Sequence, residues 1–489
     1  MSRQTPKPTT PEDWTRSDQY HNSFLLAEDQ ILDAVLENSS ANGLPDIAVS
    51  AAQGKFLSLL ASSIGAKKIL EVGTLGGYST IWLARALPAD GELITLEYSE
   101  KHAKVAQENI ERAGLSSKVK IMVGLGHDSL LQLHPDIPFD LVFIDADKPS
   151  NVKYFTEAKR LVRKGGVIIV DNVVRYARVA DPEYTSPNVE GVRDLLKAIK
   201  GDTEVDATTI ATVGDKGYDG FFVCYSEVEA SKAYGQYCSH ESVPHLILSS
   251  ARSLSDPYPL SYDPALDHMS QLTTPEDWAR SDQYHNSFLL EDDAILDAAL
   301  KNSTANGLPE AAVSAAQGKF LRLLASSIGA KRILEVGTLG GYSAIWLARA
   351  LPADGELITL ECNEKHAKVA QENIARAELS SKIKIIVGLG HESMLQLHPD
   401  IPFDLVFIDA DKQSNMKYFT EAKRLVCKGG IVDNVVRDGK VSNPEYTDAS
   451  VEGVRALLQA IEGDAEVDAT TIATVGEKGY DGFLYAIRK

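Results

Sequence analysis

Cysteine is scarce in this 489-residue sequence, and no two of its four cysteines form a C-x-x-C pair. The two halves of the internal repeat described below share none of the cysteine positions, which are Cys224, Cys238, Cys362 and Cys427. This distribution argues against a disulfide framework or a zinc site. It favours a compartment in which thiols stay reduced.

Basic residues are also in deficit, because 49 Lys and Arg face 69 Asp and Glu and the net charge is −20. Sequence-independent binding to nucleic acid needs clustered basic residues, so we expect no such partner. No stretch approaches the ~20 apolar residues of a membrane span. The polar, Pro- and Thr-rich beginning contains no apolar signal core. We therefore expect a cytoplasmic protein without a membrane partner.

The nicotinamide-binding pattern G-x-G-x-x-G is missing as well, and residues 69–79 read ILEVGTLGGYS instead. The apolar run predicts a buried strand, followed by a glycine turn and a helix. Open α/β sheets bind ligands at such strand ends, although a tight turn without a ligand is the alternative. Glu71, two residues before the first glycine, would repel a diphosphate. It would suit the sulfonium and ammonium groups of S-adenosylmethionine.

The sequence is duplicated. Glu71 recurs as Glu335, an offset of 335 − 71 = 264, whereas Asp171 recurs as Asp433, an offset of 433 − 171 = 262. Two residues are therefore missing from the second copy, between Gly430 and Asp433. A repeat this long indicates a duplicated domain and no solenoid. We predict domains at residues 1–225 and 269–489, joined by a Ser-, Pro- and Tyr-rich linker at residues 226–268.

Strands and helices alternate along each copy. In copy one we expect helices over residues 11–40, 50–64, 78–87, 99–114, 151–162 and 189–199, and strands over 69–72, 92–97, 119–123, 139–144 and 167–170. Residues 207–213 and 220–224 flank a Gly- and Asp-rich turn and predict a hairpin. The fold class is α/β, with two tandem Rossmann-like domains. Each has a mostly parallel seven-stranded sheet, helices on both faces and an antiparallel C-terminal hairpin.

Acidic residues end three of these strands. Glu97, repeated as Glu361, follows the first glycine of the turn by 97 − 73 = 24 residues, where dinucleotide-binding folds place a ribose-binding acid. Asp145 ends strand four, and Asp171-Asn172 end strand five. The carboxyl ends of adjacent parallel strands lie side by side, so these hard oxygen donors predict a site for Mg²⁺ or Ca²⁺. Helix N-capping and ion pairing with Lys148 are the alternative.

A divalent ion would also explain Lys148, which recurs as Lys412. The ion would lower the pKa of a bound hydroxyl, and burial beside positive charge would lower that of the lysine. A phenol could then lose its proton to the lysine and attack the methyl group of the sulfonium. The enzyme would act chiefly by positioning and charge compensation.

These motifs, in this order, resemble those of the metal-dependent class I O-methyltransferases, which include caffeoyl-CoA and catechol O-methyltransferases. The resemblance covers residues 50–224 and 314–489. It implies cofactor contacts from Val49, Glu71, Gly73, Gly77, Ser79, Glu97, Gly126 and Asp145, and from Val313, Glu335, Gly337, Gly341, Ser343, Glu361, Gly390 and Asp409. It implies metal ligands at Asp145, Asp171 and Asn172 and at Asp409, Asp433 and Asn434, with Lys148 and Lys412 as bases.

Some residues depart from the family pattern. Ser150-Asn151 stand where the family usually has Asn-Tyr, and the adenine-side G-x-A reads Gly124-Leu125-Gly126. After Asp171-Asn172 the family places a glycine, which copy two keeps as Gly439 and copy one replaces with Ala177. Substrate preference therefore stays open.

In copy two the fifth strand is cut to Ile431-Val432. Either Gly429-Gly430 enter the strand, or Asp433-Asn434 move away from the metal. We predict weaker metal binding and lower stability for copy two.

The function expected is methyl transfer to a small phenolic substrate, with vicinal hydroxyls that chelate the ion. One alternative is a non-catalytic or half-active tandem paralogue that binds the cofactor. Another is a nicotinamide-dependent oxidoreductase. Relatives commonly form dimers, so the copies could pair within one chain as a pseudo-dimer, or across two chains as a homodimer.

Overall fold

The computed structural model describes residues 9–227, called copy one here, and residues 273–489, called copy two. Cys238 and nearly all of the predicted linker lie outside the described residues, so the domain boundaries stay a prediction. Cys224, Cys362 and Cys427 form no disulfide. Among the described residues, no helix is both long enough and apolar enough to cross a bilayer.

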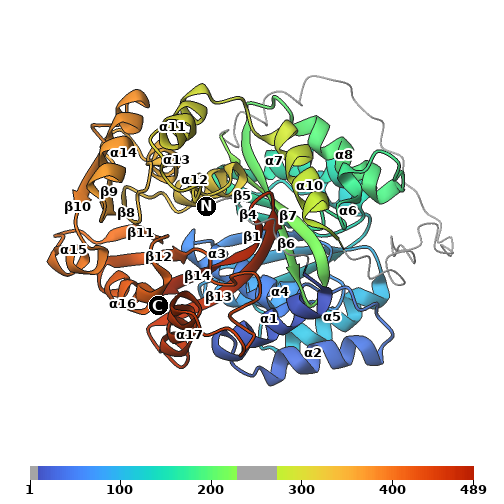
Figure 1. Ribbon diagram of the computed structural model, residues 1–489. Coiled ribbons are helices and arrows are strands. Elements are labelled where there is room, and N and C mark those ends of the chain that lie inside the picture. The colour runs from blue at the N-terminus through green and yellow to red at the C-terminus, as the bar shows by residue number, and fades with distance from the viewer. Residues whose placement is uncertain (1–8, 228–272) are drawn as a thin grey trace.

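Each copy folds into alternating strands and helices (Figure 1). The helices of copy one are α1 (Pro11–Leu25), α2 (Gln30–Ala41), α3 (Ala51–Ser63), α4 (Tyr78–Ala86), α5 (Glu100–Arg112), α6 (Gly126–Leu131), α7 (Asn151–Leu161) and α8 (Pro187–Ile199). Its strands are β1 (Lys68–Val72), β2 (Glu92–Glu97), β3 (Val119–Val123), β4 (Phe139–Ile144), β5 (Val162–Val170), β6 (Val205–Gly214) and β7 (Gly217–Ser226). Short 3-10 helices span Lys148–Ser150 (η1) and Arg178–Ala180 (η2).

Copy two repeats this order. Its helices are α10 (Pro275–Leu289), α11 (Ala294–Ala305), α12 (Ala315–Ser327), α13 (Tyr342–Ala350), α14 (Glu364–Arg376), α15 (Gly390–Gln396), α16 (Asn415–Leu425) and α17 (Ala449–Ile461), with a 3-10 helix, η3, at Lys412–Ser414. Its strands are β8 (Arg332–Val336), β9 (Glu356–Glu361), β10 (Ile383–Val387), β11 (Phe403–Ile408), β12 (Val426–Val432), β13 (Val467–Gly476) and β14 (Gly479–Arg488).

The predicted fold class is confirmed. In copy one the strand order is β3-β2-β1-β4-β5-β7-β6, and only the closing hairpin is antiparallel. Alternate strand side chains enter two apolar clusters: one lies under α2 to α5, and the other under α1, α7 and α8. This double burial explains why the central strands are apolar throughout, because both faces of the sheet are covered.

Three expectations about local structure need correction. The single helix expected over residues 11–40 is two helices, because the Asp29 side chain accepts hydrogen bonds from Ile31 N and Leu32 N and caps a new helix. Strand five begins at Val162, so it includes the two glycines that were expected to precede it. The short helix α6 was not expected from the sequence.

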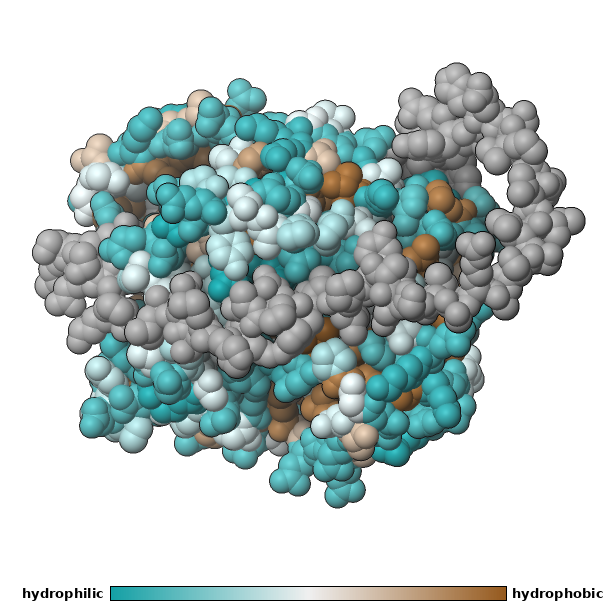
Figure 2. Space-filling model, turned by 90° about the vertical axis from the view of Figure 1, so that its right-hand side faces the viewer, coloured by the Kyte–Doolittle hydropathy of each residue, from teal (hydrophilic) through white to brown (hydrophobic). Residues whose placement is uncertain are grey.

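The two copies lie against each other and share one 14-stranded sheet. The edge strands β6 and β13 meet through a single antiparallel pair, Thr212 with Thr474. Figure 1 shows the two hairpins, green and red, side by side at the centre of the molecule. The indole rings of Trp14 and Trp278 lie 6.4 Å apart, so equivalent residues meet at this junction. Figure 2 shows another face, where hydrophilic residues cover most of the described surface around smaller hydrophobic groups.

The two-residue deletion of copy two is absorbed within its fifth strand. Gly429 and Gly430 take the places opposite β11 that Val167 and Ile168 occupy opposite β4. Asp433 N still donates to Ile408 O at 2.9 Å, as Asp171 N does to Ile144 O at 2.9 Å. The glycines are therefore drawn into the strand, and the backbone of Asp433 keeps its place. Weaker metal binding by copy two stays a prediction.

The deletion leaves one apolar position of copy two unfilled. A Cβ on Gly429 would lie 3.7 Å from the Tyr485 hydroxyl oxygen, so Tyr485 takes up some of the space that Val167 fills in copy one. A Cβ on Gly430 would meet only Val406, so the equivalent of the fully buried Ile168 is missing.

Inserting Val-Ile after Gly430, together with Tyr485→Val, is expected to stabilise copy two. The gain should be about 2 kcal/mol, the value of burying one large aliphatic side chain. Amide hydrogen exchange in β11 and β12 measures it locally. Deleting Val167 and Ile168 from copy one is the matched reverse change and should speed exchange in β4 and β5. Unchanged exchange in both variants would contradict the prediction.

Candidate active site

The glycine turn after β1 depends on close backbone contact. Gly73 has φ +104°, and a Cβ there would lie 2.1 Å from the carbonyl oxygen of Asp145. Gly77 has φ +82° and caps α4 in the left-handed conformation. Gly337 repeats the contact of Gly73, at 2.1 Å from Asp409 O. The first glycine therefore lets the ends of β1 and β4 lie together, where an added side chain would separate them.

Glu71 is fully buried under this turn. Its carboxylate accepts hydrogen bonds from the hydroxyls of Ser79 at 2.7 Å, Thr80 at 2.5 Å and Thr95 at 2.7 Å. Burial raises the pKa of Glu71 to about 7, and these hydroxyls oppose the shift. The side chain thus joins β1, β2 and the start of α4. A cofactor contact from Glu71 or Ser79 stays a prediction.

Copy two has one donor fewer at the same place. Glu335 accepts hydrogen bonds from Ser343 and Thr359, each at 2.6 Å, and Ala344 stands where copy one has Thr80. Burial raises the pKa of Glu335 to about 7.

Glu97 lies across the glycine turn, as its position at the end of β2 predicted. Its carboxylate accepts hydrogen bonds from the backbone amides of Leu75 at 2.8 Å, Thr74 at 3.3 Å and Ser99 at 2.9 Å. Glu361 accepts equivalent bonds from Leu339 N at 2.8 Å and Asn363 N at 2.9 Å. The acid is therefore held beside the turn, and ribose binding by it stays a prediction.

The strand ends bring the predicted metal ligands together. Asp145 N donates to Val72 O at 2.8 Å, and Asp171 N to Ile144 O at 2.9 Å, so these residues leave neighbouring strands at the same level. Burial and the negative charge of Asp145 both raise the pKa of Asp171. Asn172 follows with φ +55°, in the left-handed region that asparagine tolerates.

A divalent cation fits this donor set. Asp145 and Asp171 repel each other, and one lysine offsets only part of their charge. Two carboxylates and an amide are ligands that Mg²⁺ and Ca²⁺ accept. Among residues 9–227 and 273–489 no group of three or more His, Cys, Asp and Glu side chains gathers that could hold a metal. The remaining ligands of an ion here would be substrate or water.

Lys148 lies at the start of η1 and is 4% exposed. Its Nζ is 3.0 Å from Asp145 Oδ1, and in copy two Lys412 Nζ is 2.8 Å from Asp409 Oδ1. The turn packs closely on α8, because a Cβ on Gly191 would lie 2.1 Å from Lys148 O. The lysine is thus placed beside the predicted metal ligands.

Two polar contacts at this edge were not predicted. Tyr154 on α7 donates a hydrogen bond to Asp147, and a Cβ on Gly126 would lie 3.0 Å from the Tyr154 ring. Gln317 on α12 donates to Asp433 at 2.7 Å. Each contact joins side chains from different elements. The sequence shows only that these residues are polar, so neither contact could be predicted from it.

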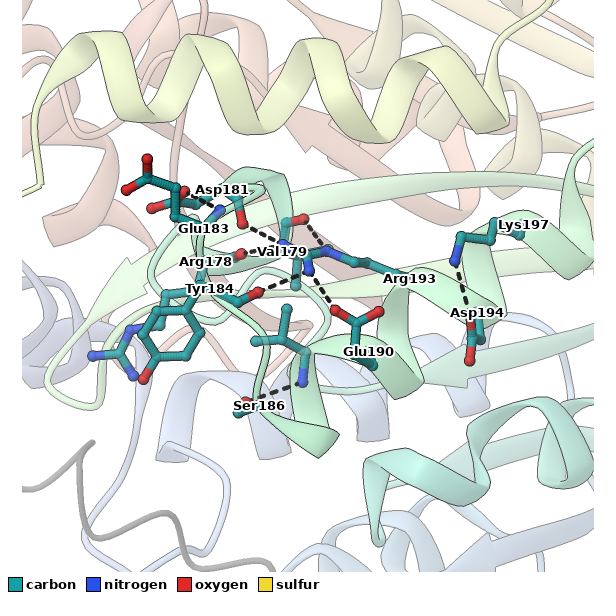
Figure 3. A network of polar contacts seen from close by, with 11 residues as sticks. Arg178, Val179, Asp181, Glu183, Tyr184, Ser186, Glu190, Arg193, Asp194 and Lys197 are labelled. Atoms are coloured by element: carbon teal, nitrogen blue, oxygen red, sulfur yellow. Dashed lines mark hydrogen bonds and ion pairs between the residues drawn. The ribbon is translucent and has the colours of Figure 1, made fainter.

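The loop after β5 is held by one buried arginine. Arg193 on α8 donates to the carbonyl oxygens of Val179 at 3.0 Å, Tyr184 at 2.8 Å and Arg178 at 3.1 Å, and to that of Asp181 (Figure 3). Glu190 pairs with it at 2.6 Å. Arg455 repeats this arrangement in copy two, with Glu452 at 2.6 Å.

This loop also carries backbone strain that differs between the copies. Arg175, Tyr176 and Ala177 have φ values of +51°, +57° and +61°. In copy two the third position is Gly439, with φ +73°. The glycine that the family pattern requires is therefore at a left-handed position, and Ala177 adopts the same conformation at a steric cost.

In copy two the site residues open on a cavity of about 1080 Å³. Its lining includes eight predicted site residues, namely Val313, Gly337, Ser343, Glu361, Gly390, Asp409, Lys412 and Asn434. Glu335 and Asp433 are buried, with 0% and 3% of their surface exposed, and do not line it. This volume slightly exceeds the range of about 300 to 1,000 Å³ that is usual for small-molecule sites.

This sheet, with its glycine turn, strand-end acids and buried lysine on one edge, defines an α/β methyltransferase. The family described as O-methyltransferase matches residues 22–225 and 286–486. The chain belongs to this O-methyltransferase family, carries the domain twice, and is an S-adenosylmethionine-dependent enzyme.

Two similar proteins and one solved structure each match less than half of this chain. The catechol O-methyltransferase of Niastella koreensis is 52% identical over 205 residues, which cover 42% of this chain and 93% of that protein. The catechol O-methyltransferase of Mycobacterium tuberculosis is 50% identical over 204 residues, covering 42% and 92%. The structure of an O-methyltransferase from Bacillus cereus in complex with SAH is 49% identical and covers 44% of this chain and 100% of that one, with a TM-score of 0.44.

Proposed function

We propose that each copy transfers the methyl group of S-adenosylmethionine to a hydroxyl of a small phenolic substrate, one with vicinal hydroxyls. The supporting observation is the cluster of two acids, an asparagine and a buried lysine beside the glycine turn. The names of the two catechol O-methyltransferases, at 52% and 50% identity, agree with this substrate class. The family match argues against the nicotinamide-dependent alternative.

In this proposal Asp145, Asp171 and Asn172 hold a divalent cation, Mg²⁺ in preference to Ca²⁺, and Asp409, Asp433 and Asn434 do the same in copy two. The cation, when bound, lowers the pKa of a substrate hydroxyl and compensates its charge. Glu97 and Glu361 bind the cofactor ribose. The glycine turns let the cofactor approach the backbone.

Lys148 takes the proton of the reacting hydroxyl at Nζ. The oxygen then attacks the methyl carbon, and the bond from that carbon to sulfur breaks with its electron pair on sulfur. An ether and S-adenosylhomocysteine result. To accept this proton Lys148 must present its neutral amine; its burial keeps water from Nζ, and Asp145, at 3.0 Å, orients Nζ toward the strand ends.

The test is methyl transfer from labelled S-adenosylmethionine to a panel of catechols by the full chain, with and without EDTA. We expect EDTA to abolish turnover and Mg²⁺ to restore it. Monophenols without a second hydroxyl are the matched control and should react poorly. Turnover that is indifferent to EDTA would remove the cation from the proposal. Cofactor binding without turnover would favour the non-catalytic alternative.

A further inference from the structure

An amide side chain contacts the aspartate at the end of the fifth strand in each copy. Gln317, in the first turn of α12, donates from Nε2 to Asp433 Oδ1 at 2.7 Å. In copy one the equivalent Gln53 side chain acts on Asp171, where its amide opposes the rise in the pKa of that carboxyl caused by burial and by Asp145. Both aspartates are at least 96% buried, and the backbone amide of Asn172 also donates to Asp171 Oδ1 at 2.9 Å. An uncharged amide cannot neutralise a carboxylate, but it fixes the direction in which its oxygens point.

The helix that carries Gln317 is bound by the other copy. The carbonyl oxygen of Ala316, the neighbouring residue, accepts a hydrogen bond from Thr208 Oγ1 of β6 at 3.3 Å. One turn further, Lys319 Nζ is 2.6 Å from Asp206 Oδ1, also on β6. Lys319 is 8% exposed, so this ion pair is largely shielded from solvent.

The equivalent contacts hold the corresponding helix of copy one. The carbonyl oxygen of Ala52 accepts a hydrogen bond from Thr470 Oγ1 of β13 at 3.2 Å, and Lys55 pairs with Asp468. The rings of Phe56 and Phe320 lie 6.4 Å apart, so α3 and α12 also meet each other. Each helix is therefore fixed on one side by its own site and on the other side by the opposite copy.

We propose that Gln317 and Gln53 are positioning residues for Asp433 and Asp171, and that each copy holds in place the glutamine helix of the other. This inference rests on the proposed metal site. It makes the cation affinity of copy two depend on β6 of copy one, and that of copy one on β13 of copy two. The pairing of copies within the chain then contributes to both sites.

The first test measures Mn²⁺ binding to the full chain by electron paramagnetic resonance. Asp145→Asn with Asp171→Asn removes the site of copy one, so the signal reports copy two alone. In this background Gln317→Met, close in size but without the amide, is expected to weaken Mn²⁺ binding about 10- to 100-fold, as is typical for partners of metal ligands. Gln53→Met is the matched control and should leave binding unchanged.

The second test uses the same background and changes only the opposite copy. Thr208→Val removes the hydroxyl that holds Ala316 O, and is expected to weaken Mn²⁺ binding to copy two about fivefold, the effect of one hydrogen bond. Thr470 holds the helix of copy one, so Thr470→Val should leave Mn²⁺ binding to copy two unchanged. When Asp409→Asn and Asp433→Asn remove the site of copy two instead, the signal reports copy one. Thr470→Val should then weaken Mn²⁺ binding, and Thr208→Val should have no effect.

The outcomes separate the two proposals. Absence of Mn²⁺ binding by the unmodified chain would overturn the proposed metal site itself. Binding that is unchanged by Gln317→Met would overturn the positioning role while leaving the metal site standing. Binding weakened by Gln317→Met but equally affected by Thr208→Val and Thr470→Val would overturn the dependence of one copy on the other.

Discussion

A chain with both Lys148→Ala and Lys412→Ala is expected to lose methyl transfer by a factor of about 10² to 10⁴, the usual contribution of a general base. Both lysine side chains are almost completely buried, and each Nζ lies within 3.0 Å of a strand-end aspartate, which is the place the proposal gives to the base. Initial rates with labelled S-adenosylmethionine at saturating catechol measure the loss. The single variants then divide the activity between the copies.

Two further variants separate proton transfer from charge. Lys148→Arg with Lys412→Arg keeps a positive charge beside each aspartate but replaces the amine with a guanidinium, which stays protonated and cannot act as a base. We expect this chain to bind the cofactor and stay as slow as the alanine variant. The exposed Lys104→Ala is the control and should retain full activity. Near-normal rates in the arginine variant would assign the lysines to charge compensation alone.

The strands and the site could be predicted because their signals are local. Each buried strand is a short apolar run, and each predicted ligand comes directly after one, so the parallel sheet gathers Asp145 and Asp171 whatever the helices do. The helix break at Asp29 was missed because a capping aspartate looks like any polar surface residue in an amphipathic pattern. The duplicated sequence also predicted which residues recur, and so which positions the deletion in β12 would affect.

Contacts between distant elements were beyond sequence reasoning. Glu71 was interpreted from its charge alone, yet its hydroxyl partners come from α4 and β2 and could not be counted in advance. The contact of Gln317 with Asp433 could not be predicted either, because it depends on how α12 packs over the sheet. The contacts between the copies follow from two surfaces that meet only after folding. Sequence patterns report which face of an element is buried, and three-dimensional packing decides what covers it.

Two histidines at the junction of the copies should make stability depend on pH. His21 Nδ1 is 3.0 Å from Thr471 Oγ1, and His285 Nδ1 is 3.1 Å from Thr209 Oγ1, so each ring contacts the other copy. Both histidines are 2% exposed. Burial lowers the pKa of His21 to about 3 and that of His285 to about 4. In the folded chain both rings therefore stay neutral at pH 5.

The direction in which stability changes with pH follows from proton binding. Below the unfolded pKa of about 6.5 the unfolded chain takes up two protons that the folded chain cannot accept, so stability falls as the pH falls. Each histidine contributes about 1.4 kcal/mol per pH unit, or about 4 kcal/mol for both between pH 6.5 and pH 5. Asp18 and Asp282 act in the opposite direction, because burial raises the pKa of each to about 7. The histidine contribution must therefore be measured as a difference between variants.

Chemical denaturation of the full chain and of the His21→Asn with His285→Asn variant, at pH 7 and pH 5, isolates that difference, because the aspartates cancel. We expect the unmodified chain to lose about 4 kcal/mol more than the variant on going to pH 5. Faster amide exchange in β6 and β13 should accompany the loss, since protonation would place charge between the copies. The exposed His134→Asn is the control and should follow the unmodified chain. If the double variant and the unmodified chain lose the same stability between pH 7 and pH 5, the junction accommodates charged histidines. The copies would then be less tightly packed than their contacts indicate.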